Sequence, residues 1–205
     1  MPGLVLASKS PRREVLLRYV APEFTVDPVP VEEVAPRGLA VGEALEVIAR
    51  KKALAAGAKY PGEWVLAADT VVVFHGELIG KARDEPSLRR QLAMLMGETH
   101  QVWTGLALAW NGAAVDGQSA VSAVHMDRLP VAVLDAYAVS EQWYGKAGGY
   151  GIQDPLVRPF LHVKSGPWSN VVGLPLKATF DLLRRNNVPC REPPTEEWLQ
   201  QNNPF

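Results

Sequence analysis

A nearly continuous apolar run at residues 65–74 constrains the fold of this chain more than any other feature. Its sequence, VLAADTVVVF, is typical of a strand that is covered on both faces of a sheet. Only Asp69 and Thr70 interrupt the run. A carboxylate inside such a strand is costly unless it is paired, hydrogen-bonded or bound to a metal. Either Asp69 marks a bend and bonds nearby backbone amides, or it is a functional carboxylate at the end or kink of a central strand.

The rest of the chain alternates short apolar strands with segments of helical periodicity. An Asn111-Gly112 pair between two strand-like segments indicates an antiparallel hairpin. These features together predict an α/β fold with a mixed sheet. Helices are expected within residues 11–20, 39–60, 86–98, 129–143 and 169–188, and further strands at 4–7, 77–80, 99–110, 113–127 and 160–166.

The first expected helix begins with an unfavourable pair of charges. Ser10 suits the N-cap and Pro11 the first helical position, which places Arg12 and Arg13 in the first turn. Each cation there costs about 0.3–1 kcal/mol, because a helix N-terminus is already positive. Either a bound anion offsets this cost, since helix starts and arginine forks both bind phosphates, or both side chains point into water.

A further cation, Lys52, occupies a position that continues the apolar stripe of the helix at 39–60. It either extends its charged end from the edge of the core to solvent or projects into a cleft. Lys81 follows the strand at 77–80, and Glu33 ends a proline-rich extended segment. Cations hold phosphate oxygens and clustered carboxylates hold Mg²⁺ or Mn²⁺, and phosphoryl chemistry needs both.

Composition excludes several other classes. A net charge of −1 argues against a broad nucleic-acid surface, and the single cysteine, Cys190, argues against disulfides or a multi-cysteine metal site. The four histidines lack zinc-site spacing, and the chain has neither a G-x-S-x-G elbow nor a G-x-x-x-x-G-K-[ST] loop. No signal-peptide layout and no membrane-length apolar run is present, so the expected location is the cytoplasm, with no membrane partner.

Several separated motifs occur in one order: LASKSPRR, VEE, AADTVV, GKARDE, GETHQVWTG, KAGGYGIQ and SNVVGLPL. In this order they resemble the Maf family of nucleoside triphosphate pyrophosphatases, over nearly the whole chain. The resemblance implies an inosine triphosphate pyrophosphatase-like (Maf/Ham1) fold with two lobes around a deep cleft. It also implies cleavage of a nucleoside triphosphate to the monophosphate and pyrophosphate, a divalent cation (Mg²⁺ or Mn²⁺), a role in removing unwanted nucleotides, and a homodimer. We expect one domain at residues 1–190 and a peripheral tail at 191–205.

The resemblance also assigns residues. Asp69 matches the catalytic acid/base, with Lys81 and Glu33 as further catalytic residues and Glu33 and Asp69 as metal ligands. Thr70 and Gln153 match positions that read the base, and a glutamine amide suits the O4/N3–H edge of uracil or thymine. The expected substrate-binding residues are Ser8, Ser10, Arg12, Arg13, Lys52, Thr70 and Gln153.

At Arg12, Thr70 and Gln153 the chain resembles the branch that prefers dTTP and UTP. Three departures from the family pattern are Ala82 after the GK motif, Asp154 in place of glycine after YGIQ, and Trp168 in place of tyrosine. Asp154 leaves base selectivity open. The alternatives are a non-catalytic nucleotide-binding regulator of cell division, or the same cleavage acting on 7-methyl-GTP or other modified nucleotides.

Overall fold

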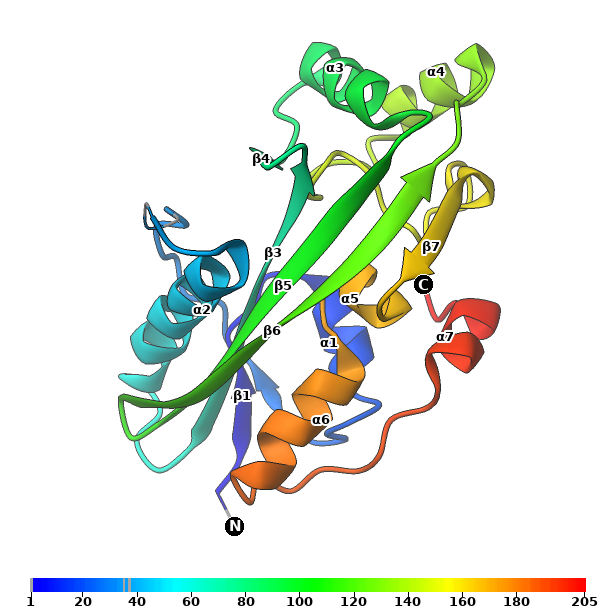
Figure 1. Ribbon diagram of the computed structural model, residues 1–205. Helices are drawn as coiled ribbons and strands as arrows, with labels where there is room; N and C mark the ends of the chain where they lie inside the picture. Colours follow the sequence, from blue (N-terminus) through cyan, green and yellow to red (C-terminus); the bar gives the residue numbers. More distant parts are fainter. Residues whose placement is uncertain (1, 35, 37) are drawn as a thin grey trace.

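One mixed sheet organises the protein in a computed structural model, which describes residues 2–34, 36 and 38–205 (Figure 1). The sheet order is β2-β1-β3-β5-β6-β7. β4 pairs with the C-terminal end of β3, whereas β1 pairs with its N-terminal end. β1 runs parallel to both β2 and β3, whereas the remaining pairs are antiparallel, so the predicted α/β class and mixed sheet are confirmed. The strands are β1 (Leu4–Leu6), β2 (Thr25–Val26), β3 (Trp64–Phe74), β4 (Glu77–Ile79), β5 (Thr99–Trp110), β6 (Ala113–Met126) and β7 (Leu161–Ser165).

Helices cover both faces of this sheet. α2 (Val41–Gly57) packs on one face of β3, β5 and β6, and α5 (Trp168–Val172) and α6 (Leu176–Arg185) pack on the other, beside α1 (Pro11–Leu17) (Figure 1). α3 (Glu85–Leu95) and α4 (Val131–Ser140) lie together at the end of β5 and β6 that is opposite the hairpin joining these two strands. None of the helices in the described part of the chain has the length and apolar character needed to cross a bilayer.

The turns follow the sequence signals. Asn111 and Gly112 have φ angles of 49° and 73°, which suits the two-residue hairpin that joins β5 to β6. His75 and Gly76, with φ angles of 48° and 82°, form the corresponding tight turn before β4. These positive angles are favourable for asparagine and glycine, so the hairpin register was predictable from the chain itself.

The apolar residues of β3 alternate between two cores, because successive side chains of a strand point to opposite faces. Val65 and Ala67 pack toward α2 with small residues of that helix. Leu66, Ala68 and Val72 belong to the larger core on the opposite face. The alternation places Asp69 on the α2 face and Thr70 on the face of α1 and α5.

The C-terminal segment contains a helix, α7 (Glu196–Asn202), that the sequence analysis did not predict. Leu199 is fully buried, and the Glu196 carboxylate accepts hydrogen bonds from the Ser169 amide and hydroxyl at 2.8 and 2.6 Å. This end of the chain is therefore tied to the body. The division into residues 1–190 and 191–205 stays a prediction.

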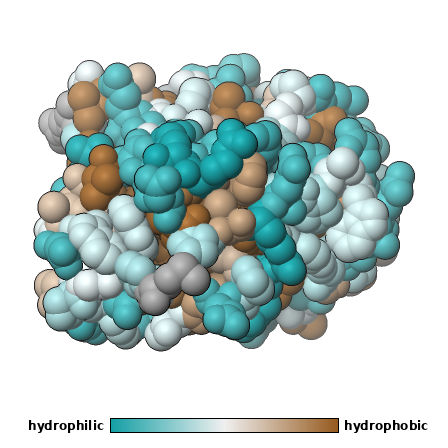
Figure 2. Space-filling view, turned by 90° about the horizontal axis from the view of Figure 1, so that it is seen from below, coloured by the Kyte–Doolittle hydropathy of each residue, from teal (hydrophilic) through white to brown (hydrophobic). Residues whose placement is uncertain are grey.

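The surface seen from below the view of Figure 1 is mostly hydrophilic, with hydrophobic residues in separate groups between polar ones (Figure 2).

Of the departures from the family pattern, Ala82 and Trp168 are both buried in the larger core. They are therefore accommodated by packing and remove no charged group.

A close contact between β5 and α2 gives a first test of the fold. A Cβ added at Gly105 would lie 2.5 Å from the carbonyl carbon of Leu45 and 2.6 Å from the amide nitrogen of Glu46, both backbone atoms of α2. Gly105→Ala is therefore expected to lower the free energy of unfolding by about 1–3 kcal/mol, as overpacking generally does. Urea denaturation measures this change. The control is Gly80→Ala, where the added Cβ meets nothing within 4 Å, and equal stability of the two variants would contradict the packing described.

Candidate active site

The candidate site is a cavity of about 770 Å³ beside the middle of β3. It is lined by residues of the β1–α1 connection, the segment before α2, the middle of β3 and the loop at 144–153. All ten residues predicted for the site line this one cavity: Ser8, Ser10, Arg12, Arg13, Glu33, Lys52, Asp69, Thr70, Lys81 and Gln153.

The middle of β3 opens into the cavity because its neighbours on one edge stop short of it. β1 pairs with β3 only as far as Leu66, and β4 pairs from Val72 onward. Between these points no strand of the described part of the chain pairs with this edge of β3, so Asp69 and Thr70 reach the same cavity from opposite faces of the strand. Asp69 therefore lies within a continuous strand and pairs with Gly105 of β5 without a register shift, so the predicted bend or strand end at this position is wrong.

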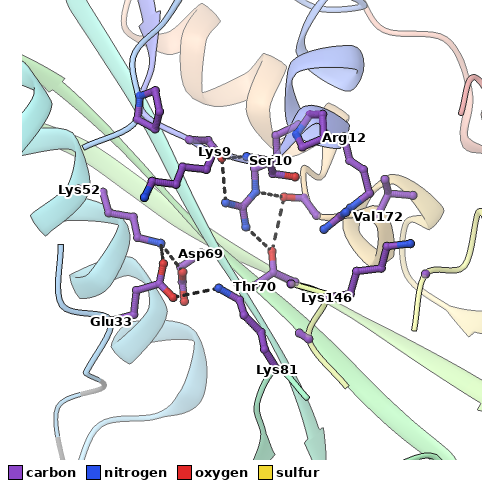
Figure 3. A pocket seen from close by; sticks show the side chains of 18 of the residues that line it. Lys9, Ser10, Arg12, Glu33, Lys52, Asp69, Thr70, Lys81, Lys146 and Val172 are labelled. Carbon is purple, nitrogen blue, oxygen red and sulfur yellow. Dashed lines mark hydrogen bonds and ion pairs between the residues drawn. The ribbon is translucent and has the colours of Figure 1, made fainter. Parts of the chain in front are cut away.

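Asp69 belongs to a cluster of four charged residues, two carboxylates and two lysines (Figure 3). Lys52 Nζ donates to Asp69 Oδ1 at 2.5 Å and to Glu33 Oε1 at 2.6 Å, and Lys81 Nζ donates to Glu33 Oε2 at 3.2 Å. Asp69 and Lys52 are buried, with 7% and 8% of their surfaces exposed. Of the two sequence interpretations of Lys52, the structure supports the one in which it projects into a cleft.

The two lysines also determine the ionisation of Glu33. Partial burial alone would raise the pKa of the Glu33 carboxyl, but the hydrogen bond and charge of Lys52 and the charge of Lys81 together lower it. Glu33 is therefore an anion at neutral pH. Two carboxylates consequently converge on a single cationic point, the Lys52 ammonium.

The adjacent arginines differ sharply in their surroundings. Arg13 donates from Nε to the Gly173 carbonyl at 2.8 Å and from Nη1 to the Ala68 carbonyl at 2.8 Å and Ser8 Oγ at 3.3 Å. Its Nη2 donates to Thr70 Oγ1 at 2.9 Å. Four of its five N–H groups are thus used within the protein, which leaves one to face a ligand.

Arg12, in contrast, makes no hydrogen bond or ion pair with any residue that the structure describes. Burial lowers the pKa of the Arg12 guanidinium, and the nearby Asp154 and Tyr137 oppose this shift. A partly buried cation without a direct partner favours a bound anion. The charge clash predicted at the start of α1 is therefore resolved in two ways: Arg13 ties β3 to the Gly173 turn after α5, and Arg12 stays available.

The two serines that precede α1 also differ in how far their hydroxyl groups are used within the protein. Ser10 is the N-cap and Pro11 the first helical residue, as predicted, but the Ser10 hydroxyl makes no capping hydrogen bond. Ser8 Oγ accepts from the Ser10 amide at 3.2 Å as well as from Arg13, so its own proton remains to be donated. The Thr70 hydroxyl is engaged by Arg13 and lies 2.9 Å from Thr104 Oγ1, and its role as a base reader stays a prediction.

Two cationic residues that line the cavity, Lys9 and Lys146, were not among the predicted site residues. Of these two, Lys146 is the one with a partner among the described residues. It lies in the glycine-rich loop at 144–153, where the Gly148 amide donates to the Gly80 carbonyl at 3.0 Å beside Lys81. Lys146 is buried and paired with Asp154. The KAGGYGIQ segment contains the available signal, because a lysine beside a glycine-rich loop can line a ligand site.

The family assignment comes from comparison with known proteins. The sequence pattern of the Maf-like proteins matches residues 3–186. The chain belongs to the Maf-like protein family. A dTTP/UTP pyrophosphatase of Sphingopyxis alaskensis is 42% identical over 201 residues, covering 92% of this chain and 99% of the relative. The dTTP/UTP pyrophosphatase of Pyrococcus horikoshii is 38% identical, covering 92% and 99%.

Among solved structures, a HAM1 protein of Coxiella burnetii aligns with a TM-score of 0.40 and 19% identity, over 63% of this chain and 75% of that protein. The family resemblance predicted from the motifs is thus confirmed through the sequence relatives.

Proposed function

We propose that this member of the Maf-like family hydrolyses dTTP and UTP to the nucleoside monophosphate and pyrophosphate. The observation that carries this proposal is the buried Lys52, which joins Glu33 and Asp69 in the cavity that is also lined by Arg12, whose side chain has no partner among the described residues. Two relatives named dTTP/UTP pyrophosphatase, alike over most of the chain, support the substrate assignment.

The cationic and hydroxyl side chains of the cavity would bind the triphosphate. Arg12, the remaining N–H of Arg13 and Lys81 would neutralise the triphosphate, and Ser8 and Ser10 would donate to its oxygens. Gln153 would contact the base.

Asp69 would act as the general base. A water oxygen forms a bond to the α-phosphorus, the bond from the α-phosphorus to the bridging oxygen breaks, and pyrophosphate leaves. Asp69 takes the proton of the water, and Lys52 orients the Asp69 carboxylate through the hydrogen bond to Oδ1.

The donor set fits a divalent cation. Mg²⁺ typically binds one or two carboxylates together with substrate phosphates and retains water, and Glu33 and Asp69 supply two carboxylates that already share one cation. Among the described residues no cluster of three or more acidic, histidine or cysteine side chains forms a metal site, so substrate oxygens would complete the coordination. When bound, the metal polarises the phosphate and lowers the pKa of its water.

A product assay tests the proposal. The purified protein with Mg²⁺ or Mn²⁺ is expected to convert UTP and dTTP to UMP or dTMP plus pyrophosphate. In H₂¹⁸O the label should enter the monophosphate. Chelation with EDTA is expected to reduce turnover at least a hundredfold, with recovery on addition of Mn²⁺. Release of phosphate and UDP would contradict the bond assignment, and tight UTP binding without turnover would support a non-catalytic regulator.

A substrate panel that includes 7-methyl-GTP separates the remaining alternative, since higher kcat/KM on that nucleotide would overturn the pyrimidine assignment. The homodimer, the cytoplasmic location and the house-cleaning role stay predictions.

A further inference from the structure

A second buried ion pair lies in the wall of the cavity, away from Asp69. Lys146 Nζ lies 2.5 Å from both carboxylate oxygens of Asp154, and the Tyr137 hydroxyl donates to Asp154 Oδ2 at 2.7 Å. All three residues are buried, with 8%, 6% and 0% of their surfaces exposed. The Asp154 carboxylate is therefore held in one orientation by two donors.

The fixed carboxylate in turn orients the neighbouring amide. Gln153 Nε2 donates to Asp154 Oδ1 at 3.1 Å, whereas Gln153 Oε1 is buried and has no hydrogen-bond partner among the described residues. Rotating the amide by half a turn would place Oε1 against Oδ1, two acceptors with no proton between them. The hydrogen bond would be lost and replaced by a repulsion. Asp154 thus selects one of the two amide orientations.

The absence of a side chain at Gly151 leaves room for the Asp154 carboxylate and the Gln153 amide to lie close together. A Cβ added at Gly151 would lie 2.6 Å from Asp154 Oδ2, 2.7 Å from Oδ1 and 2.7 Å from Gln153 Nε2. The Asn203 side chain at the end of α7 donates to the Gln153 carbonyl at 3.1 Å from behind. Gln153, Gly151 and Lys146 all line the cavity.

An oriented amide discriminates between pyrimidine bases. Uracil and thymine carry a donor at N3 and an acceptor at O4, while cytosine carries an acceptor at N3 and a donor at N4. One orientation of a glutamine amide matches uracil and thymine, and the flipped orientation matches cytosine. A buried acceptor without a partner, such as Gln153 Oε1, is costly until a ligand supplies a donor.

We propose that Asp154 is a positioning residue that fixes the Gln153 amide in the orientation that accepts from N3–H, and so excludes cytosine nucleotides. The inference rests on the proposed function and deepens it, since it names the residue that separates UTP and dTTP from CTP. Asp154 acts through Gln153 and does not itself contact the substrate.

The test compares kcat/KM for UTP and CTP in the wild type and in variants of this cluster. Asp154→Asn keeps the volume but can present either an oxygen or an N–H to Gln153, so both amide orientations become accessible. It is expected to lower the ratio of UTP to CTP at least tenfold, mainly through a lower KM for CTP. Gly151→Ala, whose added Cβ separates the carboxylate from the amide while leaving Lys146 in place, is expected to lower the same ratio.

Tyr137→Phe is the matched control in the same cluster. It removes one donor to Asp154 Oδ2 but keeps Lys146 and the Gln153 contact, so the ratio should stay within twofold of the wild type. In a Gln153→Ala background, Asp154→Asn should have no further effect on the ratio, because the residue through which it acts is gone.

The outcomes are separable from those of the proposed function. If Asp154→Asn and Gly151→Ala fold and cleave UTP with an unchanged UTP-to-CTP ratio, or if the wild type prefers CTP, the inference is overturned. A wild type that cleaves no nucleotide defeats the proposed function alone. Calorimetric titration with the non-hydrolysable α,β-methylene analogues of UTP and CTP then still tests the amide orientation, with the same expected tenfold change in the ratio of Kd values.

Discussion

Asp69→Asn is expected to reduce the rate of pyrophosphate release from UTP by about 10²–10⁴-fold, the usual contribution of a general base. Asparagine has nearly the same size and keeps an oxygen for the Lys52 ammonium, which lies 2.5 Å from Asp69 Oδ1. It cannot take a proton from water. Initial rates with Mn²⁺ at saturating UTP measure the effect on kcat.

The fold and the binding of substrate should survive this change. Measured without a divalent cation, so that the proposed metal-binding role of Asp69 does not enter, the affinity for α,β-methylene UTP is expected to stay equal or to increase, because a negative charge near the phosphates is removed. Asp181→Asn on α6 is the control, since this carboxylate is outside the cavity and pairs with Lys177 at 2.6 Å on the surface. Turnover by Asp69→Asn within threefold of the wild type, in a protein of unchanged Tm, would remove Asp69 from the reaction.

Arg13→Lys is expected to lower the free energy of unfolding by about 2–4 kcal/mol, because each buried acceptor left unsatisfied costs about 1–3 kcal/mol. The Arg13 guanidinium joins the Ala68 and Gly173 carbonyls and the Thr70 hydroxyl, which belong to β3 and to the turn after α5. A lysine keeps the charge but cannot supply these donors in one plane. Urea denaturation and the Tm measure the loss.

Arg12→Lys provides the matched comparison at the adjacent position. Its guanidinium has no hydrogen bond to the described part of the chain, so the stability should change by less than about 0.5 kcal/mol, as at ordinary surface positions. The KM for UTP should rise about tenfold, because a lysine cannot form the bidentate contact to phosphate. If both variants lose stability equally, the distinction drawn between the two arginines is wrong.

Local features of the fold were readable from the sequence because they depend on neighbours along the chain. The Asn111-Gly112 hairpin follows from residues that tolerate positive φ, and the start of α1 at Pro11 follows from a fixed proline φ. The helix α7 was missed, because its short polar sequence is stabilised by contacts of Leu199 and Glu196 with distant segments.

The sequence by itself indicated Asp69, Arg12 and Arg13 as charged residues of the site, because a carboxylate in an apolar strand and cations at a helix start are costly wherever they occur. Only the tertiary structure decided how those charges are used. The gap between β1 and β4 brings both faces of β3 to one cavity, Arg13 is consumed by carbonyls of β3 and of the turn after α5, and Asp154 is paired with Lys146. These pairings depend on how the folded chain brings donors and acceptors together. No local sequence pattern encodes which donor reaches which acceptor.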